Sequence, residues 1–153
     1  MGLSIRRATP ADAEIITEFN LRLALESEGK TLDRATLRAG VQQCLDDPAK
    51  GIYYLASDGS AILGQTMFTY EWSDWRNGWF WWIQSVYVRG DARGQGVFRA
   101  LFEHVLTEAR RQGDVIGIRL YVEEHNAAAQ NVYAKLGMAQ AGYFVLERCP
   151  LDS

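Results

Sequence analysis

One segment, residues 79–109, constrains the fold more than any other part of the chain. It begins with a mostly apolar, aromatic run over residues 79–88, which predicts a strand in the middle of a sheet. A turn containing Gly90, Gly94 and Gly96 follows. Apolar residues then recur every three or four positions, which predicts a helix with one buried face. Such a turn presents unpaired backbone N–H groups at the positive end of a helix dipole, so the segment predicts a phosphate or pyrophosphate site.

Two familiar nucleotide-binding motifs do not fit this turn. A Walker loop ends in Gly-Lys-Ser/Thr, which the turn lacks. A dinucleotide fingerprint has a third glycine, but Arg99 stands where the spacing requires it. The run from Arg93 to Phe98 instead resembles the acyl-CoA pyrophosphate loop of the GNAT N-acetyltransferases, Gln/Arg-x-x-Gly-x-Gly/Ala. Phe98 departs from the small final residue of that pattern, so we expect its side chain to point away from the phosphates.

A second run, residues 126–138, resembles the other GNAT signature, Asn-x-x-Ala-x-x-x-Tyr-x-x-x-Gly followed by an apolar residue. Asn126 and Tyr133 occupy the Asn and Tyr positions, and Gly137 occupies the Gly position. Asparagine is a common helix N-cap and glycine a common helix stop, so the run predicts a helix between them. The two signatures occur in the family's order along the chain.

The rest of the pattern predicts a single GNAT N-acetyltransferase domain over residues 1–153. The expected elements are, in order, a strand at 3–8, helices from Pro10 and from about Asp33, strands at 52–57, 61–71 and 79–88, the helix after Gly96, a strand at 118–122, the helix after Asn126 and a strand at 142–148. This order and the resemblance predict an α/β (α+β) fold, with a mixed central β-sheet flanked by helices on both faces. Residues 72–78 are expected to form a connection.

Composition excludes several classes of function. A formal net charge of −3 gives no basic surface for nucleic acid. No apolar run approaches the roughly 20 residues of a membrane-spanning helix, so no membrane association is expected. Cys44 and Cys149 are too few for a disulfide framework and predict free thiols in the cytoplasm. His104 and His125 lack the spacing of metal ligands, so no metal is expected.

The resemblance implies a cosubstrate, acetyl-CoA, and a set of residues that bind it. Backbone groups of the strand before the turn would hold the pantetheine and the thioester, and the turn would hold the pyrophosphate. The implied cofactor-binding residues are Val86, Tyr87, Val88, Arg93, Gly94, Gln95, Gly96, Val97, Phe98, Arg99 and Asn126. Tyr133 aligns with the tyrosine that protonates the leaving thiolate in this family, although a tyrosine at this spacing can also be a core residue of an amphipathic helix.

The general base and the acceptor are less defined. The strand at 79–88 resembles the diamine (polyamine) acetyltransferases, but Gln84 and Ser85 stand where that subgroup carries a Glu-Asp pair. Neither can act as a carboxylate base. The remaining candidates for receiving an amine are Gln84 itself, Glu26, Glu28 and Glu71. A surface carboxylate is solvated by default, and a chain of water molecules can also accept the proton.

Five tryptophans lie close together in the sequence and allow two interpretations. Strand alternation predicts that Trp79 and Trp81 share one face of the sheet and that Trp82 lies on the other. Most of these rings are then expected to be core or dimer contacts. Trp72 and Trp75, in the expected connection, could instead line an acceptor pocket.

These observations predict an N-acetyltransferase that moves an acetyl group from acetyl-CoA to a primary amine of a small molecule or peptide, by direct attack in a ternary complex. The alternative is a catalytically degenerate GNAT module that binds acyl-CoA as a sensor or partner-docking domain. The apolar, aromatic strands make a homodimer plausible.

Overall fold

The computed structural model describes residues 2–152, which form two compact units that divide between Tyr121 and Val122. The first unit holds a sheet and three long helices, α1 (Ala13–Glu28), α2 (Arg34–Asp46) and α3 (Val97–Gln112). The second unit holds one helix, α4 (Ala127–Lys135), and the C-terminal segment. Among the described residues no helix is both long and apolar enough to cross a bilayer.

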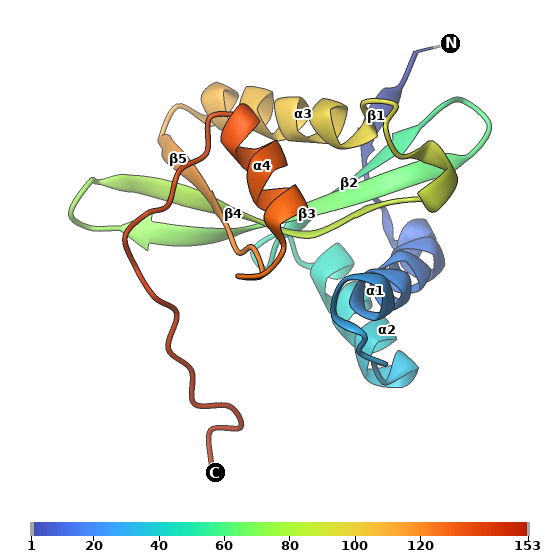
Figure 1. Cartoon of the computed structure of the whole chain (residues 1–153), viewed down its shortest axis with the longest axis horizontal. Helices are drawn as coiled ribbons and strands as arrows, with labels where there is room; N and C mark the ends of the chain where they lie inside the picture. Colours follow the sequence, from blue (N-terminus) through green and yellow to red (C-terminus); the bar gives the residue numbers. More distant parts are fainter. Residues whose placement is uncertain (1, 153) are drawn as a thin grey trace. The chain divides into compact units, whose positions relative to one another are not determined.

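The first unit contains a five-stranded sheet whose strands follow the order of the sequence (Figure 1). The strands are β1 (Ser4–Arg7), β2 (Ile52–Ser57), β3 (Ile62–Ser73), β4 (Gly78–Val88) and β5 (Val115–Leu120). Each pair of neighbours is antiparallel except β4 and β5, which are parallel. The sheet is therefore mixed, as the sequence predicts.

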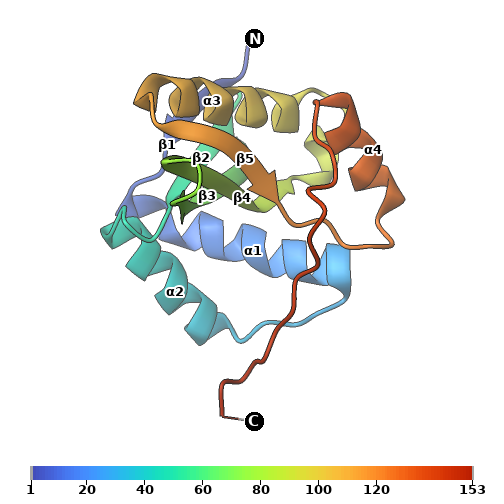
Figure 2. The same ribbon diagram turned by 90° about the vertical axis from the view of Figure 1, so that its left-hand side faces the viewer.

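Helices cover both faces of this sheet (Figure 2). On one face, α1 and α2 pack over β2, with Ile16, Val41 and Leu55 in the shared core. On the other face lies α3, whose predicted apolar stripe is confirmed, since Leu101, Phe102, Val105 and Ala109 are buried there. This layered arrangement is the predicted fold class.

The start of α1 follows from local sequence. Thr9 and Asp12 form a capping box around a single 3-10 turn, Pro10–Asp12, and α1 continues from it. The helix ends at Gly29, whose φ of 64° lies in the left-handed region that glycine adopts readily. Asp33 caps α2 by accepting a hydrogen bond from the Thr36 N–H. Both helices start close to the positions that the sequence predicts, Pro10 and Asp33.

The connection expected at residues 72–78 is much shorter than predicted. Strand β3 continues to Ser73 and β4 begins at Gly78, so that Trp72 pairs with Trp79 across the hairpin. Their rings meet edge to face at 5.0 Å. The polar residues at 72–78 led to the prediction of a longer connection. Pairing of aromatic side chains across the two strands instead extends both strands into this range. β5 likewise begins and ends earlier than expected, at Val115 and Leu120.

In the second unit the strand expected at 142–148 is wrong: the described residues after α4 include no strand. Phe144 and Leu146 in this segment are 96% and 92% exposed. The apolar run has strand-forming residues, but a strand also needs a neighbour whose N–H and C=O groups pair with it. The sequence pattern shows that these residues favour a strand, but it does not show whether a neighbouring strand is present to pair with them.

Candidate functional site

The predicted phosphate-binding turn lies at the N-terminus of α3. The helix begins at Val97 and has Gly96 as its N-cap; within residues 2–152 no side chain caps it, and its first turn holds no acidic residue. The first backbone N–H groups of a helix have no partner within the helix, so the N–H groups of the first turn of α3 point out of its end. This end of α3 therefore offers hydrogen-bond donors and a partial positive charge to an anion.

Two of the three glycines of this turn have backbone conformations that favour glycine. Gly94 has φ 78° and Gly96 has φ 82°, in the left-handed region. A Cβ built at either position would have no heavy atom within 4 Å, so the space in front of both is open. A bulky group can approach the backbone here, which is what binding of a pyrophosphate requires.

The strand that leads into the turn, β4, continues beyond the end of its pairing with its parallel neighbour, β5. Within the described residues, pairing of β4 with β5 extends only as far as Ile83 and Leu120. Val86, Tyr87 and Val88 lie beyond that point, where β4 has no β5 partner. The backbone groups of this stretch that face β5 are thus available to a ligand, although the Val88 carbonyl already accepts a 3.0 Å hydrogen bond from Arg93 Nε.

A bulge shapes the same stretch of β4. Between the pairs Gln65–Tyr87 and Met67–Gln84, β4 has one more residue than β3. Ser85 takes up the extra residue with φ 52°, unusual for a residue other than glycine. Its carbonyl accepts a 3.0 Å hydrogen bond from Gln65 Nε2, which is completely buried. The bulge turns Tyr87 toward α1, the face on which Gln84 also lies.

Gln65 and Asn20 belong to a buried polar cluster that the sequence analysis missed. Gln65 Nε2 also donates to Asn20 Oδ1 (3.3 Å), and Asn20 Nδ2 lies 3.4 Å from the Tyr53 hydroxyl. The sequence contains a signal for it, because Gln65 stands between Leu63 and Met67 at positions that alternate onto one face of the strand. We infer that the hydrogen bonds of this cluster hold the bulge in position.

Close packing holds the turn against the sheet. Gly64 on β3 pairs with Val88 on β4, and a Cβ at Gly64 would lie 2.8 Å from the Tyr87 carbonyl oxygen and 3.0 Å from Val97 Cγ1. Only glycine fits this position without displacing its neighbours. The first residue of α3 can therefore approach β3 closely at Gly64, next to the unpaired stretch of β4, and this contact fixes the position of the helix N-terminus.

Glu26, predicted to receive the acceptor, instead links α1 to the turn. Its Oε2 accepts a 2.6 Å hydrogen bond from the Tyr87 hydroxyl, and its Oε1 accepts one of 2.6 Å from Arg93. The hydrogen bonds from Tyr87 and Arg93 hold the pKa of Glu26 below its ordinary value of 4.5. A carboxylate in this state is a weak base, and the side chain of Arg93 is turned toward Glu26 and Val88.

The other candidate acceptor residues are also engaged. Arg119 contacts both oxygens of Glu71, at 3.1 and 3.2 Å, and the Trp82 indole N–H donates to Glu71 at 2.8 Å. Glu28 lies 3.4 Å from Lys30. Gln84 Nε2 donates to Thr69 Oγ1 at 2.7 Å. The structure thus brings Gln84 and Glu71 to one face of the β3–β4 hairpin, together with Trp82, while Glu26 and Glu28 lie at the end of α1.

Asn126 and Tyr133 lie in the second unit. The Asn126 side chain accepts a hydrogen bond from the Ala129 N–H and caps α4, as its sequence position predicts. Tyr133 lies within the same helix, and burial raises the pKa of its hydroxyl above the ordinary value of 10. The phenol is therefore fully protonated at neutral pH, which a general acid requires.

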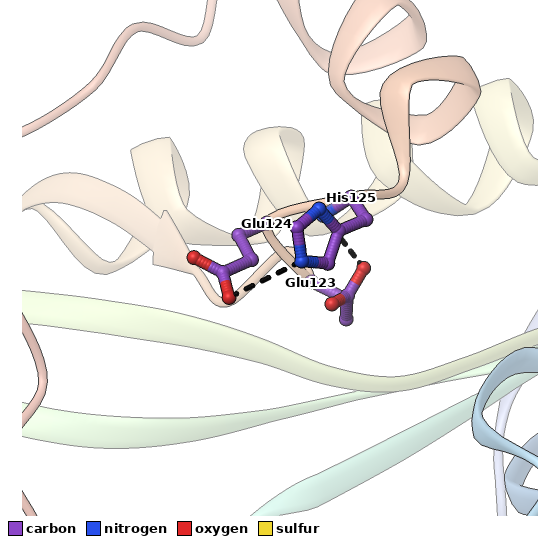
Figure 3. A group of neighbouring side chains, drawn as sticks. All are labelled: Glu123, Glu124 and His125. Carbon is purple, nitrogen blue, oxygen red and sulfur yellow. Dashed lines mark hydrogen bonds and ion pairs between the residues drawn. The ribbon is translucent and has the colours of Figure 1, made fainter.

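Just before α4, the side chains of Glu123, Glu124 and His125 gather at the surface (Figure 3). The Glu123 carboxylate accepts a 2.7 Å hydrogen bond from the His125 N–H, and His125 Nε2 lies 3.4 Å from Glu124 Oε1. All three are consecutive and exposed, so the turn itself explains their proximity. We assign no ligand to this group.

Comparison with known proteins agrees with these features. The sequence profile of the Acetyltransferase (GNAT) family matches residues 17–138, and the chain belongs to this family. A comparison with curated protein sequences gave no match. Among solved structures, the chain is similar to one described as a possible acetyltransferase from Clostridium difficile 630, with 42% identity, a TM-score of 0.90 and coverage of 95% of this chain and 96% of that one.

More distant structures share the fold. A predicted acetyltransferase with acetyl-CoA from Clostridium acetobutylicum has 16% identity and a TM-score of 0.79, with 96% of each chain covered. A ribosomal-protein-alanine N-acetyltransferase from Brucella melitensis biovar Abortus 2308 has 16% identity and a TM-score of 0.78, with 96% of this chain and 99% of that one covered.

Proposed function

We propose that the chain is an N-acetyltransferase that uses acetyl-CoA and acetylates a primary amine of a small molecule or peptide. The observation that carries the proposal is the juxtaposition, within the first unit, of the open α3 N-terminus and the stretch of β4 that has no β5 partner. The first matches a pyrophosphate and the second a pantetheine and thioester. We propose that both units belong to one catalytic domain, which the match across residues 17–138 supports.

In the proposed reaction the nitrogen of a neutral amine attacks the thioester carbonyl carbon. A new C–N bond forms, the C–S bond breaks and coenzyme A leaves as a thiolate. Backbone donors of residues 86–88 stabilise the charge that develops on the carbonyl oxygen. Tyr133 gives its proton to the departing sulfur, and Asn126 contributes to cofactor binding.

The amine must also lose a proton. Each carboxylate predicted for this task is already paired with a cation: Glu26 with Arg93, Glu28 with Lys30 and Glu71 with Arg119. We therefore propose that water accepts the proton. The face with Gln84 and Glu71 is the proposed position of the acceptor.

The test is amine-dependent release of the coenzyme A thiol by the full chain, measured with a panel of amines. The proposal predicts release with at least one amine and acetylation of that amine by mass spectrometry. The alternative function, an acyl-CoA sensor, is favoured by the absence of an unpaired carboxylate at the candidate positions. It predicts binding of acetyl-CoA without release for every amine.

We also propose a homodimer in the cytoplasm. The two cysteines are free thiols, as a reducing compartment favours. The exposed apolar side chains of Tyr143, Phe144, Val145 and Leu146 support self-association, since contiguous exposed apolar residues commonly mark an interface. Light scattering should give twice the mass of one chain, and the double substitution of Phe144 and Leu146 by serine should give the mass of a monomer.

A further inference from the structure

A cavity of about 810 Å³ lies on the α3 face of the sheet, away from the site described above. It is bounded by β2, β3, β4 and the last turn of α3, where Glu108 and Gln112 border it. The helix rises about 1.5 Å per residue, so Glu108 lies roughly 16 Å along its axis from Val97 at the proposed phosphate end. Gln84 and Glu71 project from the opposite face of the hairpin.

Aromatic side chains form most of the cavity wall. They are Tyr54, Phe68, Tyr70, Trp79 and Trp81. Phe68 and Trp81 stack with their centroids 3.9 Å apart, and Tyr70 meets Trp79 and Trp81 edge-on at 6.2 and 6.4 Å. The Tyr70 hydroxyl donates a 2.7 Å hydrogen bond to the Pro48 carbonyl, which holds the loop at the cavity rim. These contacts between the wall side chains therefore hold them in position.

Two side chains that line the cavity carry hydrogen-bond donors, the Tyr54 hydroxyl and the Trp81 indole N–H, and neither donor has a hydrogen-bond partner among the described residues. The Tyr54 and Trp81 side chains are more than nine-tenths buried, with exposed fractions of 9% and 5%. The side-chain atoms that are themselves buried and lack a partner in the described chain are Gln65 Oε1 and Thr66 Oγ1, so the two donors are not sealed in the interior and are free to donate to a ligand or to water in the cavity. The Tyr54 hydroxyl lies near Arg7, Tyr70 and Glu108, which all border the cavity. Burial raises the pKa of this phenol, so it remains a donor at neutral pH.

The charges around the cavity balance. Arg7 and Lys50 border it, and so do Glu108 and Asp114. Lys50 is paired with Asp47 at 3.0 Å, and Glu108 lies 3.4 Å from Arg111. Two cations and two carboxylates leave no net field that would select a charged ligand. The volume falls within the range of about 300–1,000 Å³ typical of small-molecule sites.

We propose that this cavity binds an uncharged, planar aromatic molecule that carries a hydrogen-bond acceptor. The aromatic walls contact the plane and edges of the ligand, and Tyr54 Oη and Trp81 Nε1 donate to its acceptor atom. The site is separate from the one proposed for acetyl-CoA and the amine.

The test uses the 15N-labelled full chain and coumarin, a neutral planar lactone. The indole N–H resonances are assigned with single Trp→Phe variants. Titration should shift the Trp79 and Trp81 resonances in a saturable manner and leave Trp75, which is 86% exposed in the β3–β4 turn, unchanged. Shifts centred on Trp75 or Trp82, or no saturable shift, would overturn the proposal. Cyclohexanone, which has the acceptor without the aromatic ring, should bind at least tenfold more weakly.

Two variants keep the test specific. Tyr54→Phe removes the hydroxyl and keeps the ring, and it should weaken coumarin binding about five- to tenfold. Tyr121→Phe is the matched control, since Tyr121 stacks on Trp82 and does not line the cavity. Equal affinity of both variants would contradict the assigned hydrogen bond. Saturating acetyl-CoA should leave coumarin affinity unchanged, and competition between the two would contradict a separate site.

Discussion

The Tyr87 hydroxyl donates a 2.6 Å hydrogen bond to Glu26 Oε2 and thereby joins the end of α1 to the part of β4 that leads into the proposed phosphate-binding turn. The second oxygen of Glu26 binds Arg93 within that turn. The Glu26 carboxylate thus connects α1 with Tyr87 on β4 and with Arg93 in the turn. Both contacts are strongest when the Glu26 carboxylate is ionised, so the strength of the connection depends on pH.

The first prediction concerns this dependence. The pKa of Glu26 is lower in the folded chain than its ordinary value of 4.5, so its contribution to stability is present above pH 4.5 and is lost as the pH falls through the lower, folded pKa. Glu26→Gln should lower the thermal midpoint at pH 7, and the difference from the wild type should shrink as the pH falls below 4.5.

Glu28→Gln is the control for this experiment. Glu28 is also near the end of α1 but pairs only with Lys30, two residues away. Its substitution should leave the midpoint at pH 7 nearly unchanged. A difference between Glu26→Gln and wild type that persists unchanged at pH 3 would show that Glu26 acts by packing instead of charge.

The second prediction concerns the close approach of α3 to the sheet. Gly64→Ala places a Cβ 2.8 Å from the Tyr87 carbonyl oxygen, so it should destabilise the fold by about 1–3 kcal/mol. It should also weaken acetyl-CoA binding, because the displaced groups are β4 and the first residue of α3. Urea unfolding and calorimetry measure the two effects.

Gly40→Ala is its matched control. Gly40 lies in α2, where a Cβ would meet nothing within 4 Å. Alanine has the higher helix propensity, so this variant should be more stable by up to about 1 kcal/mol and should bind acetyl-CoA like the wild type. Equal stability changes of the same sign in both variants would be inconsistent with the packing described for Gly64.

The third prediction tests Tyr133 as the acid. Tyr133→Phe should lower kcat by about a hundredfold or more, because general acid catalysis is commonly of this size. Acetyl-CoA affinity should stay within about twofold of the wild type. Burial keeps the pKa of Tyr133 above 10, so the wild type should show no loss of activity from ionisation of this group between pH 7 and 9. Unchanged turnover in the variant would remove the assignment.

Much of the fold is predictable from local patterns whose physical cause is also local. The capping box of Thr9 and Asp12, the cap at Asp33 and the apolar stripe of α3 each involve residues within a few positions of one another. The alternation of Trp81 and Trp82 is confirmed for the same reason: Trp81 stacks on Phe68, whereas Trp82 reaches Glu71 on the other face.

What the sequence did not predict depends on distant partners. The engagement of Glu26 with Tyr87 and Arg93 joins residues more than 60 positions apart. The extension of β3 through Trp72 depends on the pairing of Trp72 with Trp79. The described residues 142–148 form no strand, because a strand needs a neighbour to pair with and a local sequence pattern does not show whether that neighbour is present. The turn before α3 can be predicted from the sequence because its glycines and the helix that follows them are adjacent in the chain.

The most direct test of the account is a calorimetric titration of acetyl-CoA into the wild type, Gly96→Trp and Gly113→Trp. The two glycines cap opposite ends of α3 with φ of 82° and 85°, and both face open space, so the two substitutions impose the same backbone strain. The account predicts similar losses of stability for both, micromolar binding by the wild type and Gly113→Trp, and binding at least a hundredfold weaker by Gly96→Trp. Equal affinity of the two variants would contradict the placement of the pyrophosphate at the N-terminus of α3.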